Sequence, residues 1–208
     1  MNISGFKGRM GSEGWNTIQT FLARIIAFSI SLLFKISIAR LLTVEENGIF
    51  GKWLATYNYG IVAFSLGLNL SMIYYSRNNK SILNNFLSNT TVYFLLLVLS
   101  ILIGFLLPSK LYNFTIFIAV FFGLLISSLN SVQLSNNKIT TFNLTEVSKN
   151  IFIFITCLVP LYFLDSVSLN SLYILYPGAL LLTFIIFIFH INISKINFKR
   201  ISLPKLDY

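Results

Sequence analysis

Long runs of apolar residues, separated by short polar segments, cover most of the chain. A run of about 20 residues is enough for a helix, which rises 1.5 Å per residue, to cross a ~30 Å hydrocarbon core. No alternation at the ~10-residue spacing of an outer-membrane barrel is present, which favours helices. The pattern predicts six spans, at residues 18–42, 49–75, 86–107, 114–134, 145–164 and 172–193.

Polar and turn-forming residues mark the expected span ends. The first span ends at a TVEENG segment, in which Asn47-Gly48 is a turn signal. Glu146 suits the start of the fifth span by the helix dipole, and Asp165 reads as a loop residue. The prediction is an all-α membrane protein whose residues 1–194 form one lobe, followed by a basic tail at 195–208.

Composition agrees with this class. Hydrophobic residues make up 56% of the 208, charged residues only 10%, and the mean hydropathy is +0.80. About a quarter of the residues in a soluble domain are charged. The single cysteine, Cys157, excludes an intrachain disulfide and a cysteine-based metal cluster. These values indicate a polytopic membrane protein.

The distribution of basic residues predicts the orientation. An even number of spans puts both termini on one side, and ten Lys and Arg fall on that side against two on the other, so that side is expected to be cytoplasmic. The net charge of +9 is then a topology signal and not a sign of nucleic-acid binding. The ten are Lys7, Arg9, Arg77, Lys80, Lys138, Lys149, Lys195, Lys199, Arg200 and Lys205, and the two are Lys52 and Lys110.

The first span carries three cations and no acid, and ionisable groups in a span mark functional sites by default. Arg24 and Lys35 are 11 residues apart, about three turns, and therefore share one helix face, with Ser31 between them. Lys35 is roughly 10 Å from the outer end of the span, too deep for easy snorkelling. Arg24 is explained equally by snorkelling and by substrate contact. Arg40, beside Glu45 and Glu46, reads as an interfacial anchor or surface ion pair.

Other spans carry polar stripes. Asn58, Ser65 and Asn69 follow one another at i, i+7 and i+11, and Asn130 belongs to a Ser- and Asn-rich end of the fourth span. These residues are candidates to line a cavity, although interhelical hydrogen bonds explain them equally well. His190 is a lone histidine, for which a structural role outweighs a proton relay.

The sequence lacks the signatures of common enzymes. It has no Walker-type glycine loop, no Gly-x-Ser-x-Gly, no metal-ligand spacing and no paired acids within a span. The expected loops, about ten residues long, are too short for a separate catalytic domain. We therefore expect no enzymatic activity, no cofactor and no metal site.

Two stretches resemble a known family. IARLLTVEENGIFGKW, followed by AFSLGLNLSMIYYSR, is similar to the start of the polysaccharide flippases of the multidrug/oligosaccharidyl-lipid/polysaccharide exporter superfamily. The closest subgroup is the O-antigen and capsular repeat-unit flippases of bacteria. The shared features are Ala39 to Leu42, the Thr-x-Glu-x-x-Gly turn from Thr43 to Gly48, Phe64 to Leu68, and Tyr74-Tyr75.

The resemblance implies a flippase of the bacterial inner membrane. Such proteins have two six-helix lobes around a cavity that opens alternately to each side, and they move undecaprenyl-diphosphate-linked oligosaccharides between leaflets. Cavity cations are thought to receive the diphosphate. Arg24 occupies the place of a recurrent cavity arginine, whereas Lys35 rests on the helical-face argument alone. A multidrug or ion exporter half and a non-transporting assembly subunit are the alternatives.

The length departs from the family pattern. The family has twelve or more spans where six are predicted here, and the tail KINFKRISLPKLDY looks like the linker to a second lobe. The expectation is either one half of a truncated or split transporter, or a six-helix chain that pairs with a second lobe or copy. Its predicted partners are lipid-linked oligosaccharide and membrane lipids, with no nucleic acid.

Overall fold

The computed structural model describes residues 12–65, 67–78, 90–98, 110–163 and 168–190, and within these ranges all regular secondary structure is α-helical. Residues 90–98 form a helical stretch. Four helices are long and apolar enough to cross a membrane, over Gly14–Leu41, Phe114–Ser135, Ile139–Tyr162 and Leu169–Ile188. The main helices are α2 (Ser12–Leu41), α3 (Val44–Ser65), α4 (Leu68–Asn78), α6 (Lys110–Ser135), α7 (Ile139–Phe163) and α8 (Leu169–His190).

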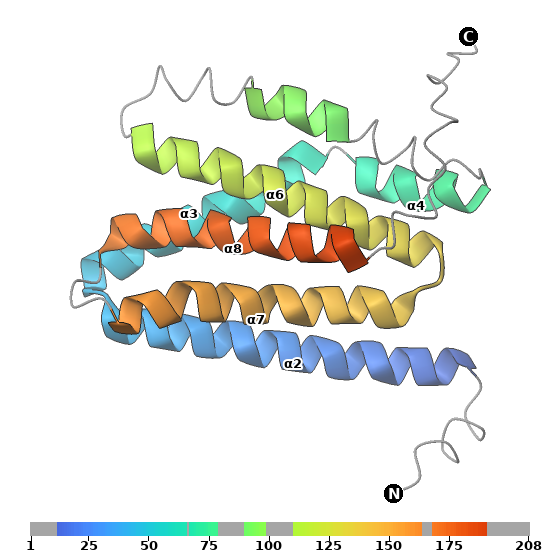
Figure 1. Ribbon diagram of the computed structural model, residues 1–208, viewed down its shortest axis with the longest axis horizontal. Helices are drawn as coiled ribbons and strands as arrows, with labels where there is room; N and C mark the ends of the chain where they lie inside the picture. Colours follow the sequence, from blue (N-terminus) through green and yellow to red (C-terminus); the bar gives the residue numbers. More distant parts are fainter. Residues whose placement is uncertain (1–11, 66, 79–89, 99–109, 164–167, 191–208) are drawn as a thin grey trace, which may run out of the picture.

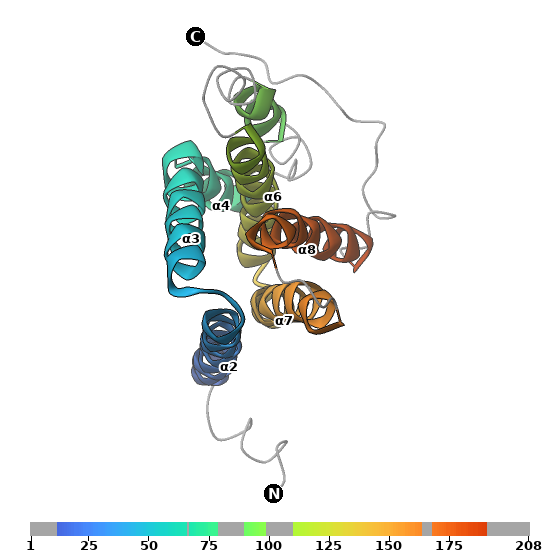
Figure 2. The ribbon, with the colours of Figure 1, turned by 90° about the vertical axis from the view of Figure 1, so that its left-hand side faces the viewer.

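The helices form a bundle whose centre is α6 (Figures 1 and 2). α6 packs against α3, α4 and α8, and α7 packs between α8 and α2. α2 and α7 run in the same direction, opposite to α6 and α8 (Figure 1). In an apolar 18-residue stretch of α6, a candidate membrane span, 67% of the residues are buried, against 11% in the corresponding stretch of α2. α6 is thus the hub, and α2 lies at the edge of the bundle.

The turn between α2 and α3 is shorter than the sequence indicated. The Glu46 carboxylate accepts hydrogen bonds from the Thr43 amide (3.1 Å) and hydroxyl (2.9 Å), and the Glu46 amide donates to Thr43 Oγ1 (3.3 Å). This reciprocal arrangement is a capping box, which begins α3 at Val44. Asn47-Gly48 therefore lies inside the first turns of α3, and its assignment as the turn was wrong.

The second predicted span, residues 49–75, is not one helix. α3 ends at Ser65 and α4 begins at Leu68, with Gly67 between them at φ +72°. This left-handed conformation is open to glycine at little cost and ends a helix. The apolar run hid the break, since a glycine inside such a run gives no hydropathy signal.

The turn between α6 and α7 has a Schellman geometry. The Lys138 amide donates to the Gln133 carbonyl (2.9 Å), the Asn137 amide donates to the Leu134 carbonyl (3.0 Å), and Asn137 has a φ of 55°. Asparagine is among the few residues other than glycine that tolerate this conformation. The turn places the start of α7 at Ile139, six residues before the predicted start of the fifth span.

The predicted third, fourth and sixth spans differ in how far the observed helices match them. The fourth and sixth, residues 114–134 and 172–193, lie close to α6 and α8. Of the third, residues 86–107, only 90–98 belongs to the described part of the chain. The six-helix count stays a prediction, as do the positions of both termini, because residues 1–11 and 191–208 lie outside the described ranges.

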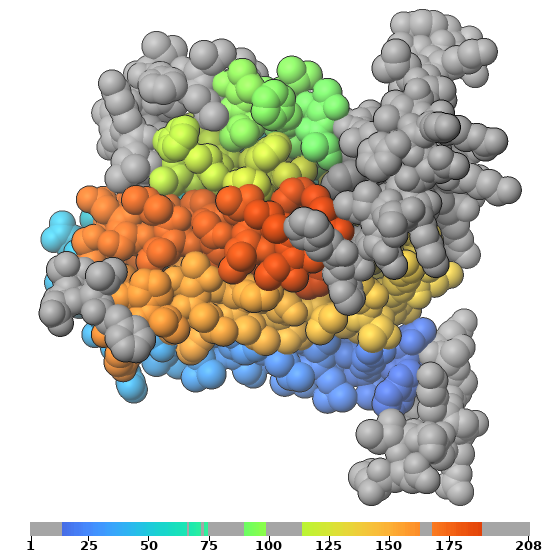
Figure 3. Space-filling model, in the orientation of Figure 1, coloured from blue at the N-terminus to red at the C-terminus, as the bar shows by residue number. Residues whose placement is uncertain are grey.

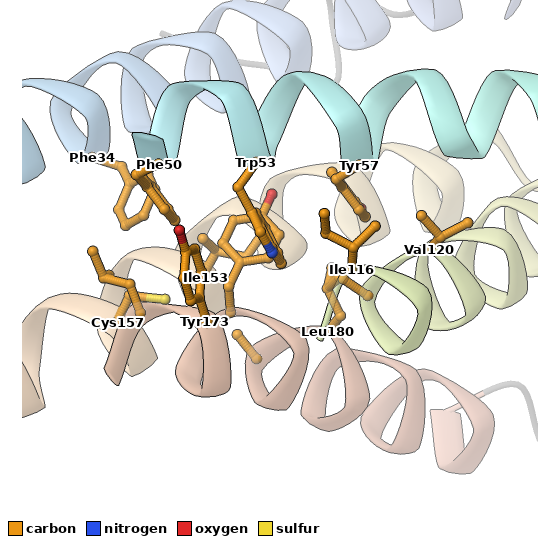
Figure 4. Packing of buried hydrophobic residues seen from close by; sticks show 14 of the residues in the cluster. Phe34, Phe50, Trp53, Tyr57, Ile116, Val120, Ile153, Cys157, Tyr173 and Leu180 are labelled. Atoms are coloured by element: carbon orange, nitrogen blue, oxygen red, sulfur yellow. The ribbon is translucent and has the colours of Figure 1, made fainter. Parts of the chain in front are cut away.

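An aromatic cluster packs between the helices of the bundle near the α2–α3 turn (Figure 4). Trp53 is fully buried and stacks between Phe50 (centroid separation 6.0 Å) and Tyr57 (6.1 Å) of the same helix. Tyr173 stacks on Trp53 (5.8 Å), and Tyr176 meets it edge-on (5.3 Å). The Trp53 indole N–H donates to Thr115 Oγ1 (3.4 Å). The cluster thereby ties α3 to both α6 and α8.

Next to this cluster, one glycine in α3 and one in α6 allow the two helices to approach closely. A Cβ added to Gly60 would lie 2.7 Å from Val120 Cγ2, and one added to Gly123 would lie 2.7 Å from Ile61 Cδ1. Small residues at helix interfaces are the usual means of close packing in membranes, where burial from lipid supplies little driving force.

The outside of the bundle is apolar and part of its inside is polar. Eight large hydrophobic side chains of α2 are exposed, whereas eight polar side chains, five of them on α6, are buried. This distribution suits a bundle surrounded by lipid, in which polar groups must find partners between the helices. α2, α7 and α8 lie side by side on the face shown in Figure 3. The eight are Phe21, Leu22, Ile25, Ile26, Phe28, Leu32, Leu33 and Ile36.

Candidate functional site

The predicted cations of α2 lie on one stripe of that helix. Arg24, Ser31 and Lys35, which we call the cationic stripe, follow one another at spacings of seven and four residues. Arg24 and Lys35 are exposed and Ser31 is half-buried. A further seven residues on, the stripe reaches Leu42, which is buried beside the start of α3. Ile38, seven residues after Ser31, is buried as well, so the cationic stripe runs along the edge of the buried side of α2.

The two cations lie at the border of the packing surface of α2. The helix packs on α7 and buries Phe34 and Ile38. In the part of the chain that the structure describes, no carboxylate lies within 4.0 Å of the Arg24 or Lys35 side-chain nitrogens. Exposed positive charge on an otherwise apolar helix is costly in lipid, so this side of α2 requires water, an anion or a partner.

Arg40 and Glu45 do not form the ion pair that the sequence allowed. The nearby Glu46 carboxylate caps Thr43, and Arg40 is exposed in the last turn of α2. An interfacial anchor is the remaining interpretation for Arg40.

The predicted polar stripe of the second span is divided by the break at Gly67. Asn58 is exposed on α3, and the Ser65 hydroxyl donates to the Val62 carbonyl of its own helix (2.9 Å). Asn69 begins a different helix, α4, so the i, i+7, i+11 spacing no longer places the three on one face.

Asn69 instead joins three helical segments. Its Nδ2 donates to Ser127 Oγ (2.9 Å), and its Oδ1 accepts hydrogen bonds from Ser128 Oγ (3.0 Å) and Tyr93 Oη (3.0 Å). These contacts tie α4 to α6 and to the stretch 90–98. Of the two interpretations of this residue, its geometry fits the interhelical hydrogen bond.

Asn130 belongs to a second polar group, which we call the charged cluster: Asn130 of α6 with Glu146 and Lys149 of α7. Asn130 Nδ2 donates to Glu146 Oε1 (2.6 Å), and Lys149 Nζ lies 3.0 Å from Glu146 Oε2. Asn130 is 7% exposed, and its Oδ1 is buried without a hydrogen-bond partner. The ion pair is more open, with side-chain exposures of 33% for Glu146 and 26% for Lys149.

Sequence reasoning missed the role of Glu146 and Lys149. Glu146 was placed at a helix start and Lys149 in the cytoplasmic loop count, whereas both lie two to three turns inside α7. Their spacing of three residues is an ion-pair signal on a helix. It became meaningful only with the earlier start of α7, which the Schellman turn sets.

The Arg24 end of the cationic stripe lies at the same level of the bundle as the charged cluster. Asn143 Nδ2 of α7 donates to Thr20 Oγ1 of α2 (3.2 Å), which fixes the register of these two parallel helices. Four residues further along each helix, Arg24 is level with position 147, between Glu146 and Lys149. Arg24 is four residues after Thr20 and Glu146 three residues after Asn143, so both lie beside this contact between α2 and α7.

Other candidate groups take no part in either feature. Cys157 is a free, buried cysteine in the apolar core, and His190 is the last residue of α8. Among the described residues, no group of three or more His, Cys, Asp or Glu could hold a metal ion.

Comparisons of the chain with protein-family models, curated proteins and solved structures found no match.

Proposed function

We propose that the chain is one lobe of an inner-membrane flippase for undecaprenyl-diphosphate-linked oligosaccharide, such as an O-antigen or capsule repeat unit. It acts together with a second six-helix lobe or a second copy, by alternating access. The observation that carries the proposal is the cationic stripe of α2: two cations with no acidic partner among the described residues, on a helix that exposes apolar side chains around them.

The chemistry of the substrate fits this stripe. A lipid-linked oligosaccharide has a long apolar tail, a diphosphate and a polar sugar, so a protein that moves it must offer positive charge beside lipid. In a site of low dielectric constant, Arg24 and Lys35 attract the diphosphate more strongly than they would in water. An exporter of cationic drugs would be repelled by the same two residues, which favours the anionic substrate.

A non-transporting assembly subunit is the second candidate. Asn69 and Asn130, both expected to line a cavity, make hydrogen bonds between helices instead. Such contacts would suffice for a purely structural bundle. A purely structural role does not explain why Arg24 and Lys35 are exposed on an apolar helix, whereas transport of an anionic lipid does. We therefore favour transport.

The proposal predicts rescue of a bacterial strain that lacks its own repeat-unit flippase. Expression of this chain in such a strain, with glycosyltransferases and polymerase intact, is expected to restore polymer at the cell surface. Arg24→Ala and Lys35→Ala should each reduce the restored polymer about tenfold or more, because one charge-assisted contact of about 1.5–3 kcal/mol is lost. The measurement is surface polymer per folded protein in the membrane.

Arg40→Ala is the matched control, since it removes a cation of the same helix outside the stripe. It should leave the restored polymer unchanged. The function of a lobe that pairs with a second copy of itself is refuted if the folded wild-type chain gives no rescue. The site assignment is refuted if the Arg24 and Lys35 variants rescue as well as the wild type.

A further inference from the structure

The donors around the Glu146 carboxylate form an anion site. Lys149 contributes an ammonium group 3.0 Å from Oε2, and Asn130 contributes an amide N–H₂ 2.6 Å from Oε1. A phosphate oxygen accepts the same charge-assisted hydrogen bonds as a carboxylate oxygen. Any phosphate-containing anion that reached Lys149 would therefore compete with Glu146 for donors that are already in place.

The charged cluster is open to such a competitor. Its ion pair is about one third exposed, and exposed ion pairs of this kind contribute little to stability. Asn130, in contrast, is more than nine-tenths buried and leaves its Oδ1 without a partner. An unsatisfied buried carbonyl is a cost that folding normally avoids. A phosphate would not satisfy this oxygen, which is an acceptor; the group that could donate to an anion is the Asn130 N–H₂, held 2.6 Å from Glu146 Oε1.

The charge at this level suits a diphosphate once Glu146 is displaced. Arg24 of the parallel helix α2 lies at the level of the Glu146–Lys149 pair, as the Thr20–Asn143 hydrogen bond requires. With Glu146 in place the three side chains sum to a single positive charge. With its carboxylate displaced, Arg24 and Lys149 are two cations on neighbouring helices at this level of the bundle.

We propose that Lys149, Asn130 and Arg24 form a binding site for the diphosphate group, and that the Glu146 carboxylate occupies this site when no substrate is bound. The proposal rests on the function proposed above for the choice of a diphosphate. Lys149 then binds the anion directly, and Asn130 transfers its N–H donor from the carboxylate to a phosphate oxygen. Glu146 acts as an internal competitor, which weakens binding and eases release.

Equilibrium binding to the purified full chain in nanodiscs of a neutral lipid tests this site. The probes are inorganic pyrophosphate and farnesyl diphosphate, which separate recognition of the free anion from recognition of a lipid-borne one. Glu146→Gln removes the competing charge but keeps a partner for Asn130, so it should bind the probe about tenfold more tightly than the wild type. Lys149→Met should bind at least about tenfold more weakly, and Lys149→Arg should keep most of the affinity.

Lys138→Met is the matched control, because Lys138 is an exposed cation of the same end of the bundle whose side chain is outside the cluster. It should bind as the wild type does. Size-exclusion profiles of every variant report folding, and the Glu146→Gln and Lys149→Arg results stand even if Lys149→Met fails to fold. Tighter binding of either probe by Glu146→Gln, together with the order Arg over Met at position 149, supports the site.

The site is refuted if Glu146→Gln binds neither probe more tightly than the wild type, or if a folded Lys149→Met binds them equally well. These outcomes are distinct from failure of the flippase function. Rescue that depends on Arg24 but not on Lys149 would leave the function standing without this site. The predicted binding pattern in a chain that rescues nothing would leave the anion site standing without the function.

Discussion

Replacement of Trp53 by alanine is expected to lower the free energy of unfolding by about 3–5 kcal/mol, the largest effect of any single change. The side chain is fully buried, and its loss leaves a cavity between Phe50, Tyr57 and Tyr173. It also removes the indole donor to Thr115, the side-chain hydrogen bond that links α3 to α6 in the aromatic cluster. Unfolding in mixed detergent micelles, followed by circular dichroism, measures the change.

Tyr59→Ala provides the control, since Tyr59 belongs to the same helix but is 76% exposed. It should change the free energy of unfolding by less than about 0.5 kcal/mol. Equal destabilisation by the two substitutions would contradict the arrangement of α3 in the bundle.

Introduction of leucine at Gly60 is expected to prevent α3 from packing on α6. Even a Cβ at this position would lie 2.7 Å from Val120 Cγ2, and overpacking of a tight interface costs about 1–3 kcal/mol, more for a side chain of this size. The expected result is a loss of the monodisperse peak in size-exclusion chromatography and a lower midpoint of unfolding.

The structure also predicts how this damage is repaired. Gly60→Ala should destabilise the protein alone, and Val120→Ala in the same chain should recover part of the loss, because the clashing methyl groups are removed. Gly51→Leu, in the same helix, is the control, since nothing lies within 4 Å of a Cβ at Gly51. A Gly60→Leu variant as stable as Gly51→Leu would contradict the close approach of the two helices.

Hydropathy predicted the helical membrane class and the four longest apolar helices, because lipid demands both length and apolar surface. It could not locate the helix ends. The start of α3 depends on the hydrogen bonds between Thr43 and Glu46, and the start of α7 on the left-handed Asn137. Single residues determine where these helices begin. A hydropathy value averaged over many residues does not show the effect of one residue.

For the candidate site, too, the sequence predicted some residue positions correctly and others not. Helical spacing alone was sufficient to place Arg24, Ser31 and Lys35 on one stripe, since α2 is one uninterrupted helix. The spacing argument failed for Asn58, Ser65 and Asn69, because Gly67 interrupts the helix between them. The charged cluster was beyond sequence reasoning, since Asn130 and Glu146 meet only through the turn that folds α7 back on α6.

Cysteine accessibility along α2 tests the central claim, that the cationic stripe faces water and not lipid. In a Cys157→Ala background, single cysteines replace Ser31 and Lys35 on the stripe, and Ile26 and Leu33 on the opposite side of the helix. Intact cells and inverted membrane vesicles are then treated with a membrane-impermeant maleimide, and the labelled fraction is measured for each position.

The account predicts labelling at positions 31 and 35 and protection at positions 26 and 33, which lie among the exposed apolar side chains. Labelling that follows this helical period would establish a water-filled side of α2 beside the cations. Absence of labelling at both stripe positions, from either side of the membrane, would contradict the claim.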